Sequence, residues 1–223
     1  DVAKTIQQDA LIIYHIPLPP TRFAMNYRLP ACTLAAALLL SMSLWVGCDS
    51  SVSSDSDNFS GPLIPLEEGN TYSFQAAGQF IDQLDFRVAG NTTISGTTYR
   101  EVEIIATGSN GETFSRTYVA RERESGLYVS LSEVNEPLIG FELQTPVSAG
   151  DTYVHTDERG NSYDVSVSGQ TTTVQAGTFE VLVYRIVNQA NGDTDIAYIA
   201  PGIGPVRIDF RGETYRLVST NVE

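Results

Sequence analysis

Cysteine, lysine, histidine and tryptophan are all scarce in this chain of 223 residues. It contains two cysteines, two histidines, one tryptophan and a single lysine, Lys4. A zinc site needs several cysteine or histidine ligands, so the composition excludes one, and a disulfide framework is excluded as well. We therefore expect no metal and no cofactor, and a fold that is stabilised by the burial of apolar side chains.

Positive charge is the second deficit of the chain. Its 27 acidic residues outnumber its 13 basic residues, which gives a formal net charge of −14 at pH 7. An acidic surface repels the phosphates of nucleic acids and the headgroups of anionic lipids. We therefore expect no nucleic-acid partner.

One long apolar run is present near the beginning of the sequence. Residues 29–47 (LPACTLAAALLLSMSLWVG) carry no charge and follow Met25 and Arg28. A basic lead followed by an apolar core is typical of a secretory signal peptide. The alternative is a transmembrane helix, which needs about 20 apolar residues. Pro30 and the absence of a basic cluster after the run favour the signal peptide.

The end of this run resembles the lipobox of bacterial lipoproteins, in which a small residue precedes a cysteine. The matching residues are Leu44, Trp45, Val46, Gly47 and Cys48. The resemblance implies that Cys48 is lipidated, that cleavage follows Gly47, and that the protein is anchored to a membrane of the bacterial cell envelope. The domain would then lie in the periplasm or on the cell surface. The alternative for Cys48 is a free structural cysteine.

These features divide the chain into four segments. We interpret residues 1–24 as an upstream extension from a start codon assigned too early, and residues 25–47 as the signal peptide. Residues 48–61 are rich in serine and aspartate and are predicted to form a flexible polar tether. Residues 62–223 are predicted to form a single domain.

The domain contains an internal repeat with an offset of 81 residues. The segment PLEEGNTYSF, from Pro65, matches PVSAGDTYVH, from Pro146, and the Asn-Gly pair at Gly111 matches the pair at Gly192. Matches that share one offset indicate a duplication, with units of about 62–140 and 141–222. We expect a pseudo-twofold arrangement, with Gly111 and Gly192 at positive φ in matching hairpins.

The pattern within both units predicts β-strands. Apolar and polar residues alternate in residues 163–168 and 206–211, whereas residues 179–187 are apolar on both faces. Period-two alternation indicates half-buried antiparallel strands, and Asn-Gly pairs between such runs indicate hairpins. We predict an all-β fold of about nine to eleven strands, in a strongly twisted antiparallel sheet that forms a barrel, a half-barrel or a sandwich.

Three phrases carry a second resemblance. They are PLEEGNTY at residues 65–72, QAGTFE at 175–180 and YIAPGIG at 198–204. The domain is similar in these phrases to uncharacterised secreted and lipoprotein β domains of bacteria, and distantly to the curved sheets of lipoprotein carriers. The second similarity implies a sheet that could cradle acyl chains.

Catalytic residues are not evident in the sequence. His155 is the only histidine after Cys48, and it lies near Asp157 and Glu158, but there is no Gly-x-Ser-x-Gly motif. The carboxylate pairs Glu122 with Glu124 and Asp193 with Asp195 could serve a hydrolase, which needs two carboxyl groups at a defined separation. Their positions on a strand face and in a hairpin predict solvated charges instead, so we expect no enzyme.

Two non-catalytic classes of function remain, with no ligand-binding residue assigned. The first is an interaction or structural module tethered in the envelope, which would contact another protein through a sheet edge or loop. The second is a module that binds or carries an apolar ligand in its curved sheet, and a carboxylate-dependent hydrolase is the third alternative. A filled core would favour the first class, and a continuous apolar cavity of several hundred Å³ would favour the second.

Overall fold

The computed structural model describes residues 62–77 and 80–222. The predicted signal peptide, lipobox and tether lie outside the described residues, and so do residues 1–24. No helix of the described part is long and apolar enough to cross a membrane.

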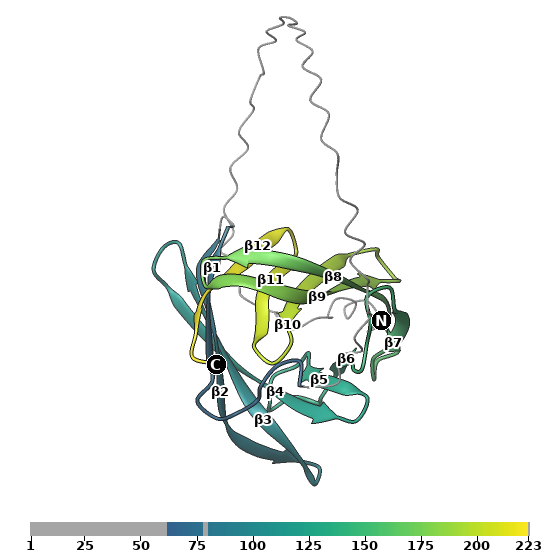
Figure 1. Ribbon diagram of the computed structural model, residues 1–223. Coiled ribbons are helices and arrows are strands. Elements are labelled where there is room, and N and C mark those ends of the chain that lie inside the picture. The colour runs from purple at the N-terminus through teal and green to yellow at the C-terminus, as the bar shows by residue number, and fades with distance from the viewer. Residues whose placement is uncertain (1–61, 78–79, 223) are drawn as a thin grey trace, which may run out of the picture. The chain divides into compact units, whose positions relative to one another are not determined.

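Twelve antiparallel strands form one sheet that curls into a nearly closed barrel (Figure 1). The prediction of an all-β antiparallel fold is confirmed, although the predicted nine to eleven strands were slightly too few. The strands are β1 (Thr71–Ala76), β2 (Ile81–Ile94), β3 (Thr97–Gly108), β4 (Thr113–Arg123), β5 (Gly126–Ser130), β6 (Gly140–Gln144), β7 (Thr152–Thr156), β8 (Ser162–Val174), β9 (Gly177–Asn188), β10 (Thr194–Ala200), β11 (Gly204–Phe210) and β12 (Glu213–Thr220).

The order of the strands in the sheet is β6-β5-β4-β3-β2-β1-β12-β11-β10-β9-β8-β7. Neighbours in this order are also neighbours in the sequence, except where the first strand, β1, pairs with the last, β12. The two edges of the sheet are β6 and β7, which face one another where the barrel closes (Figure 1). The two edge strands that meet when the barrel closes are therefore consecutive in the sequence.

Turn chemistry explains where several strands end. Gly111 and Gly192 have φ of 82° and 77°, as predicted for the two Asn-Gly hairpins. Asn110 Oδ1 accepts the backbone N–H of Glu112 at 3.0 Å, and Asn191 Oδ1 accepts that of Asp193 at 3.0 Å. Glycine adopts positive φ without the steric cost that a Cβ imposes, so it fixes both turns.

The two halves of the sheet correspond closely along the chain. The strands β1 to β4 begin 81, 81, 80 and 81 positions before β7 to β10, whereas β5 and β6 begin 78 and 73 positions before β11 and β12. Gly69 N–H donates to Val88 O at 2.9 Å, and Gly150 N–H donates to Val167 O at 2.8 Å. This correspondence agrees with a duplication, although β6 extends the first half to Gln144, beyond the predicted boundary of the units 62–140 and 141–222, and the duplication stays a prediction.

The core lies on the inner face of the curled sheet. Phe74, Leu84, Val206 and Leu217 have 0 % exposed surface. In β8, Tyr163, Val165 and Val167 are buried, and Asp164, which lies between the first two, is exposed, as the alternation predicts. Every second residue of a strand therefore faces inward, and these residues together form one continuous core.

Candidate functional site

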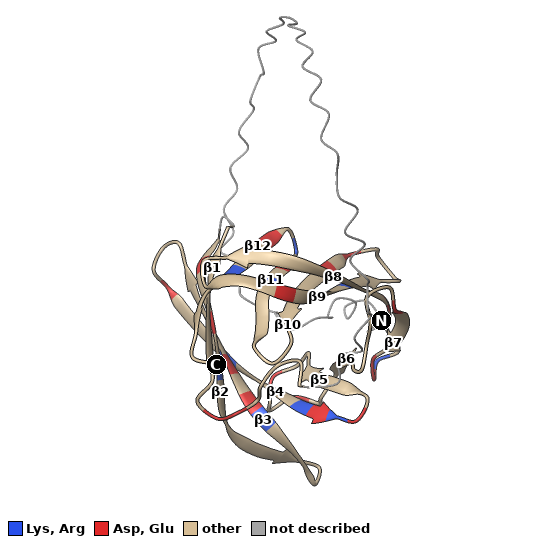
Figure 2. Cartoon of the chain, viewed as in Figure 1, with Lys and Arg blue, Asp and Glu red and all other residues tan. Residues whose placement is uncertain are grey.

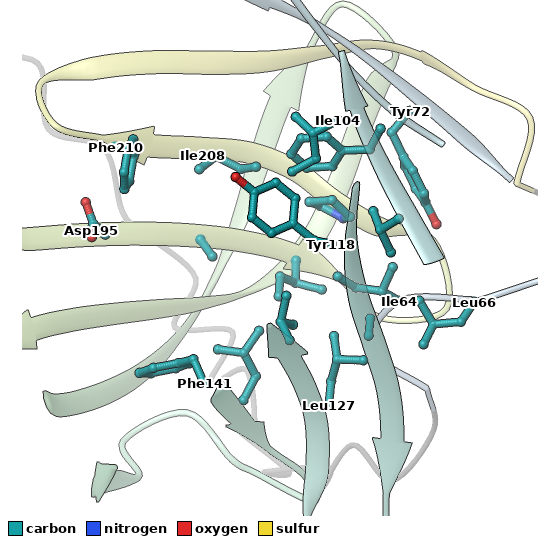
Figure 3. A pocket seen from close by; sticks show the side chains of 18 of the residues that line it. Ile64, Leu66, Tyr72, Ile104, Tyr118, Leu127, Phe141, Asp195, Ile208 and Phe210 are labelled. Carbon is teal, nitrogen blue, oxygen red and sulfur yellow. The ribbon is translucent and has the colours of Figure 1, made fainter. Parts of the chain in front are cut away.

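An apolar cavity of about 180 Å³ lies inside the barrel (Figure 3). Of its 21 lining residues, 20 are apolar or aromatic, and the exception is Asp195. Interiors of eight-stranded barrels are just filled by side chains, and the diameter grows with the number of strands. Twelve strands therefore leave space that these side chains do not fill.

The strands of the first half provide most of the cavity wall by simple alternation. Phe86 and Val88 of β2, Val102 and Ile104 of β3, and Ala120 of β4 all line it. Residues two apart in a strand point to the same face, so the period-two pattern of these strands places their apolar side chains inside. The small side chain of Ala120, which is 3 % exposed, leaves room at this wall.

The segment before β1 covers one end of the cavity. Leu63 is 2 % exposed, and Ile64 and Leu66 line the cavity at the end opposite Asp195 (Figure 3). Pro62 O accepts the N–H of Gly202 at 3.1 Å, and Pro65 O accepts the Nδ2 amide of Asn70 at 3.0 Å. The residues that directly follow the predicted tether are thus part of the core and fix one end of the cavity.

Asp195 is the charged group of the cavity wall. It lies in β10 opposite Ile186 of β9, and its side chain is half-buried. Burial raises the pKa of Asp195 to about 6, while the backbone N–H and the guanidinium of Arg211 act in the opposite direction. Asp193 raises this pKa further by charge repulsion. The carboxyl group is therefore charged at pH 8 and largely neutral below pH 5.

A tyrosine hydroxyl adds a second polar group to the cavity. Tyr118 of β4 lines the cavity, and its hydroxyl lies on the side of the ring that faces Ile208 and Asp195 (Figure 3). Burial raises the pKa of Tyr118, so the hydroxyl stays protonated and can both donate and accept a hydrogen bond. Tyr72, which also lines the cavity, has its hydroxyl at the other end, 3.5 Å from Pro65 O, so polar groups border both ends (Figure 3).

The barrel is closed between β6 and β7 by side chains, and we call this contact the seam. Among the described residues, no backbone–backbone hydrogen bond joins the two strands. Instead, Tyr153 Oη donates to Glu142 O and accepts from Gln144 N, both at 3.2 Å. Tyr184 Oη donates to Gln144 O at 3.1 Å. These side chains occupy backbone groups of an edge that would otherwise be open to pairing with another chain.

The other end of the seam is formed by His155, Glu158 and Phe141. The Nε2 of His155 lies 3.1 Å from Gly140 O, and Gly140 N–H donates to Glu158 Oε2 at 2.7 Å. The ring of Phe141 lies 4.6 Å from that of His155 and 5.5 Å from that of Tyr163, between centroids. Phe141 also lines the cavity, so the seam and the cavity share a wall.

His155 and Asp157, the candidate residues for a hydrolase, make hydrogen bonds to other partners. His155 contacts β6, whereas Asp157 is buried and accepts the N–H groups of Arg159 and Asn161 at 2.9 and 2.8 Å. Glu122 and Glu124 are exposed, as predicted. No group of three metal-ligating side chains is found in the part of the chain that the structure describes.

Asp195 was predicted to be a solvated charge, but it is half-buried at the cavity wall and therefore only partly solvated. The hairpin at Gly192 could have shown this. In the register of this hairpin, Asp195 pairs with Ile186, which is 6 % exposed. Both side chains therefore face inward. Asp193, in the turn itself, is exposed as expected. Cys48 and residues 44–47 lie outside the described residues.

Comparisons with known proteins give two similar folds. No family model matches the chain, and no curated protein is similar to it. A predicted exported protein of Bacteroides fragilis with a YmcC-like fold is 16% identical, covers 71% of this chain and 98% of its own, and superposes with a TM-score of 0.45. A predicted lipoprotein of Parabacteroides distasonis is 14% identical, with 73% and 100% covered and a TM-score of 0.45. Because both scores lie below 0.5, neither protein informs the function of this chain.

Proposed function

We propose that the β domain binds a small apolar ligand, or the apolar end of a larger amphiphile, inside its barrel. The observation that carries this proposal is the cavity of about 180 Å³ with 20 apolar or aromatic lining residues. An engineered apolar cavity of about 150 Å³ stays dry and binds benzene. The space therefore suits a ring or one alkyl segment, and it is too small for a whole lipid.

The cavity favours ligand binding over a purely structural module. A scaffold needs a filled core, because an empty space loses the dispersion contacts of its lining atoms. The open space here lies among the core side chains of the strands, and the segment before β1 covers one end of it. A bound alkyl segment would restore those contacts and bury apolar surface at about 0.8 kcal/mol per CH₂.

The function is proposed to be non-catalytic and tied to a membrane. His155 takes part in closing the seam, and Glu122 and Glu124 are exposed, so we expect binding without turnover. Lipidation of Cys48 would hold the domain at an envelope membrane, since two or more acyl chains anchor a protein stably where one does not.

The binding proposal is tested with straight-chain 1-alkanols from four to twelve carbons by isothermal titration calorimetry on residues 62–223. Affinity is expected to rise about fourfold per CH₂ and to level off at about six to eight carbons, when the chain fills the cavity. Ala120→Leu places a larger side chain in the cavity and should weaken binding about tenfold or more. Ala176→Leu, which is half-buried away from the cavity wall, is the matched control. Absence of binding at every length, or unchanged binding by Ala120→Leu, would refute the proposal.

The membrane proposal is tested with Cys48→Ser in the full-length precursor. This variant should leave the membrane fraction, whereas the wild-type protein should stay there with an acylated amino terminus by mass spectrometry. An unmodified Cys48 in the mature wild-type protein would contradict lipidation.

A further inference from the structure

The wall of the cavity is built from two kinds of backbone. All of its 21 lining residues lie in strands except Ile64 and Leu66. These two belong to residues 62–66, which we call the strap and which cover one end of the cavity (Figure 3). Each strand of the wall is held by a hydrogen-bonded ladder to at least one neighbour, whereas the strap belongs to no strand. The strap is therefore the part of the wall that can move without breaking the sheet.

The strap makes few hydrogen bonds. Pro62 O accepts the N–H of Gly202 at 3.1 Å, in the turn between β10 and β11. Pro65 O accepts the Nδ2 amide of Asn70 at 3.0 Å and the hydroxyl of Tyr72 at 3.5 Å. Two of the five strap residues are prolines, which have no N–H, and among the described residues the other three make no backbone–backbone hydrogen bond. In that part of the chain, one backbone–backbone bond, to Gly202, therefore ties the strap to the rest of the barrel.

Leu63 holds the first half of the strap by burial. It is 2 % exposed and belongs to the core, but it does not line the cavity, so its side chain fastens the strap from outside the open space. Ile64 and Leu66 are only half-buried. The strap carries no charge, whereas acidic positions lie over both halves of the sheet (Figure 2). Apolar contacts rather than ion pairs therefore keep the strap closed.

The other end of the strap leads into a fixed turn. Gly69, at φ 95°, lies in the turn before β1, and its N–H donates to Val88 O at 2.9 Å. Val88 N–H in turn donates to Asn70 O at 2.8 Å. These two bonds tie the turn to β2. The strap thus has a fixed end at this turn and a releasable end at Leu63.

We propose that the strap is the gate of the cavity. Leu63 leaves the core and Pro62 O leaves Gly202, the turn at Gly69 stays bound to β2, and the ligand passes through the end that Ile64 covers. This inference rests on the proposed function and names how the same cavity exchanges its ligand. The opposite end of the cavity is bordered by β10 and β11, which each pair with a strand on both sides, so a passage there would break ladders (Figure 3).

The seam is the competing route, because Phe141 lies both in the seam and in the cavity wall. Opening the seam would break the hydrogen bonds that the side chains of Tyr153, Tyr184 and His155 make to β6. Opening the strap breaks one backbone–backbone bond and the contacts of Pro65 O, and it exposes Leu63. The strap therefore opens more often than the seam.

A gate that is closed most of the time limits the rates of binding and release but not the affinity. Loosening it raises the association and dissociation rate constants by the same factor, because the free and the bound protein close in the same way. Fluorine NMR exchange spectroscopy measures both rate constants with 6-fluoro-1-hexanol, an analogue of the alkanols above. The protein is residues 48–223 with Cys48→Ser, which keeps the residues that precede the strap.

Two variants loosen the strap without touching the cavity wall. Leu63→Ala should raise both rate constants about tenfold or more and change the Kd by less than about twofold, since it removes a buried side chain from the strap. Asn70→Ala, which removes one hydrogen bond to Pro65 O, is the milder variant, with an expected rise of about fivefold. Leu217→Ala in β12 is the matched control. Leu217 is 0 % exposed and does not line the cavity, so this variant destabilises the core but should leave both rate constants unchanged.

Tyr153→Phe distinguishes the two routes, because it removes hydrogen bonds of the seam and no contact of the strap. It should leave ligand exchange unchanged. If it speeds exchange while the two strap variants do not, the ligand passes through the seam, and the inference is wrong while ligand binding stands. Unchanged rate constants in both strap variants would also overturn the inference. If 6-fluoro-1-hexanol does not bind the wild-type protein, the proposed function fails and the inference with it.

Discussion

Two strand contacts close this barrel, and they are built in different ways. The first and last strands, β1 and β12, pair through a backbone ladder from Tyr72↔Thr220 to Ala76↔Tyr215. The consecutive strands β6 and β7 share no backbone–backbone hydrogen bond among the described residues and meet through side chains of the seam. In chain order, each contact joins the first strand of one half to the last strand of the other.

The difference shows that an edge strand can be satisfied without a partner strand. Backbone groups of alternate residues in and before β6 point to opposite sides. Ile139 O accepts the N–H of Leu131 on the β5 side, whereas backbone groups of Gly140 and Gln144 bond to side chains on the seam side. Side chains cap these groups and protect the edge, whereas the ladder buries Phe74 and Leu217 completely. We therefore expect the ladder to contribute more to stability and the seam to open first.

The largest effect should come from proline in the ladder. Arg216 is exposed, so Arg216→Pro changes mainly the backbone of β12, which lies between β1 and β11. Loss of a ladder hydrogen bond and the ring clash should lower the free energy of unfolding by about 3 kcal/mol or more. Glu142→Pro in β6 is the variant at the seam, and Glu142→Ala is its reference because both remove the ion pair with Arg123; the further loss from proline is expected to be below about 1 kcal/mol. Urea unfolding of both variants measures the difference, and equal losses would contradict the comparison.

A smaller effect is expected from Gly140→Ala in β6. A Cβ at Gly140 would overlap with the ring of Tyr128, so this ring must move. Overpacking of this kind costs about 1–3 kcal/mol. Gly169→Ala in β8 is the control, because its Cβ would make an ordinary contact of 3.5 Å with Ala149. Thermal unfolding should separate the two variants by several degrees, and a stable Gly140→Ala would mean that the edge strand can shift freely.

The hydroxyl groups of the seam should each contribute less than that. Tyr153→Phe removes the hydroxyl that Glu142 O and Gln144 N share, with an expected loss of about 1 kcal/mol. Amide exchange should increase at Gln144 and stay unchanged in β12. Tyr215→Phe is the control, because its hydroxyl donates to the side chain of Glu213 and to no backbone group. Faster exchange in β12 for Tyr153→Phe would mean that the seam and the ladder open together.

The smallest effect concerns Asp195, which belongs to neither contact. Its pKa of about 6 lies above the ordinary value of 3.8, so the folded state binds its proton more tightly than the unfolded chain does. Its contribution to stability is therefore full below about pH 4 and is lost as pH rises through 6. Asp195→Asn should stabilise the domain at pH 8 by less than about 1 kcal/mol, because the group is half-exposed, and should have little effect at pH 4. Chemical unfolding at both pH values checks this sign.

The sequence was sufficient for the fold class because its signals are local. Alternation in β8 and the Asn-Gly turns at Gly111 and Gly192 depend on adjacent residues, and all of them appear in the structure. Whether the sheet closes depends on contacts between strands that are distant in the sequence. The pairing of β1 with β12 therefore could not be predicted from periodicity. Tertiary contacts of this kind decide the architecture.

The cavity and the seam were harder to predict, since both depend on what lies across the barrel. Asp195 has the local pattern of a hairpin charge, and only its pairing with Ile186 places it inside. His155 and Tyr153 belong to an exposed, alternating strand, and nothing in that strand indicates that their partners are backbone groups of β6. Residue type gives a side chain its chemistry, but the opposite strand supplies its partner.

The position of β1 has a mechanical consequence. β1 is the sixth of twelve strands in the sheet and is held by ladders to β2 and β12, and the segment that leads into it is fastened by the buried Leu63. A force applied through the preceding residues would load the middle of the sheet in shear, across two ladders at once, and would bypass the seam. A domain pulled by its amino-terminal end would therefore resist extension through the two ladders of β1.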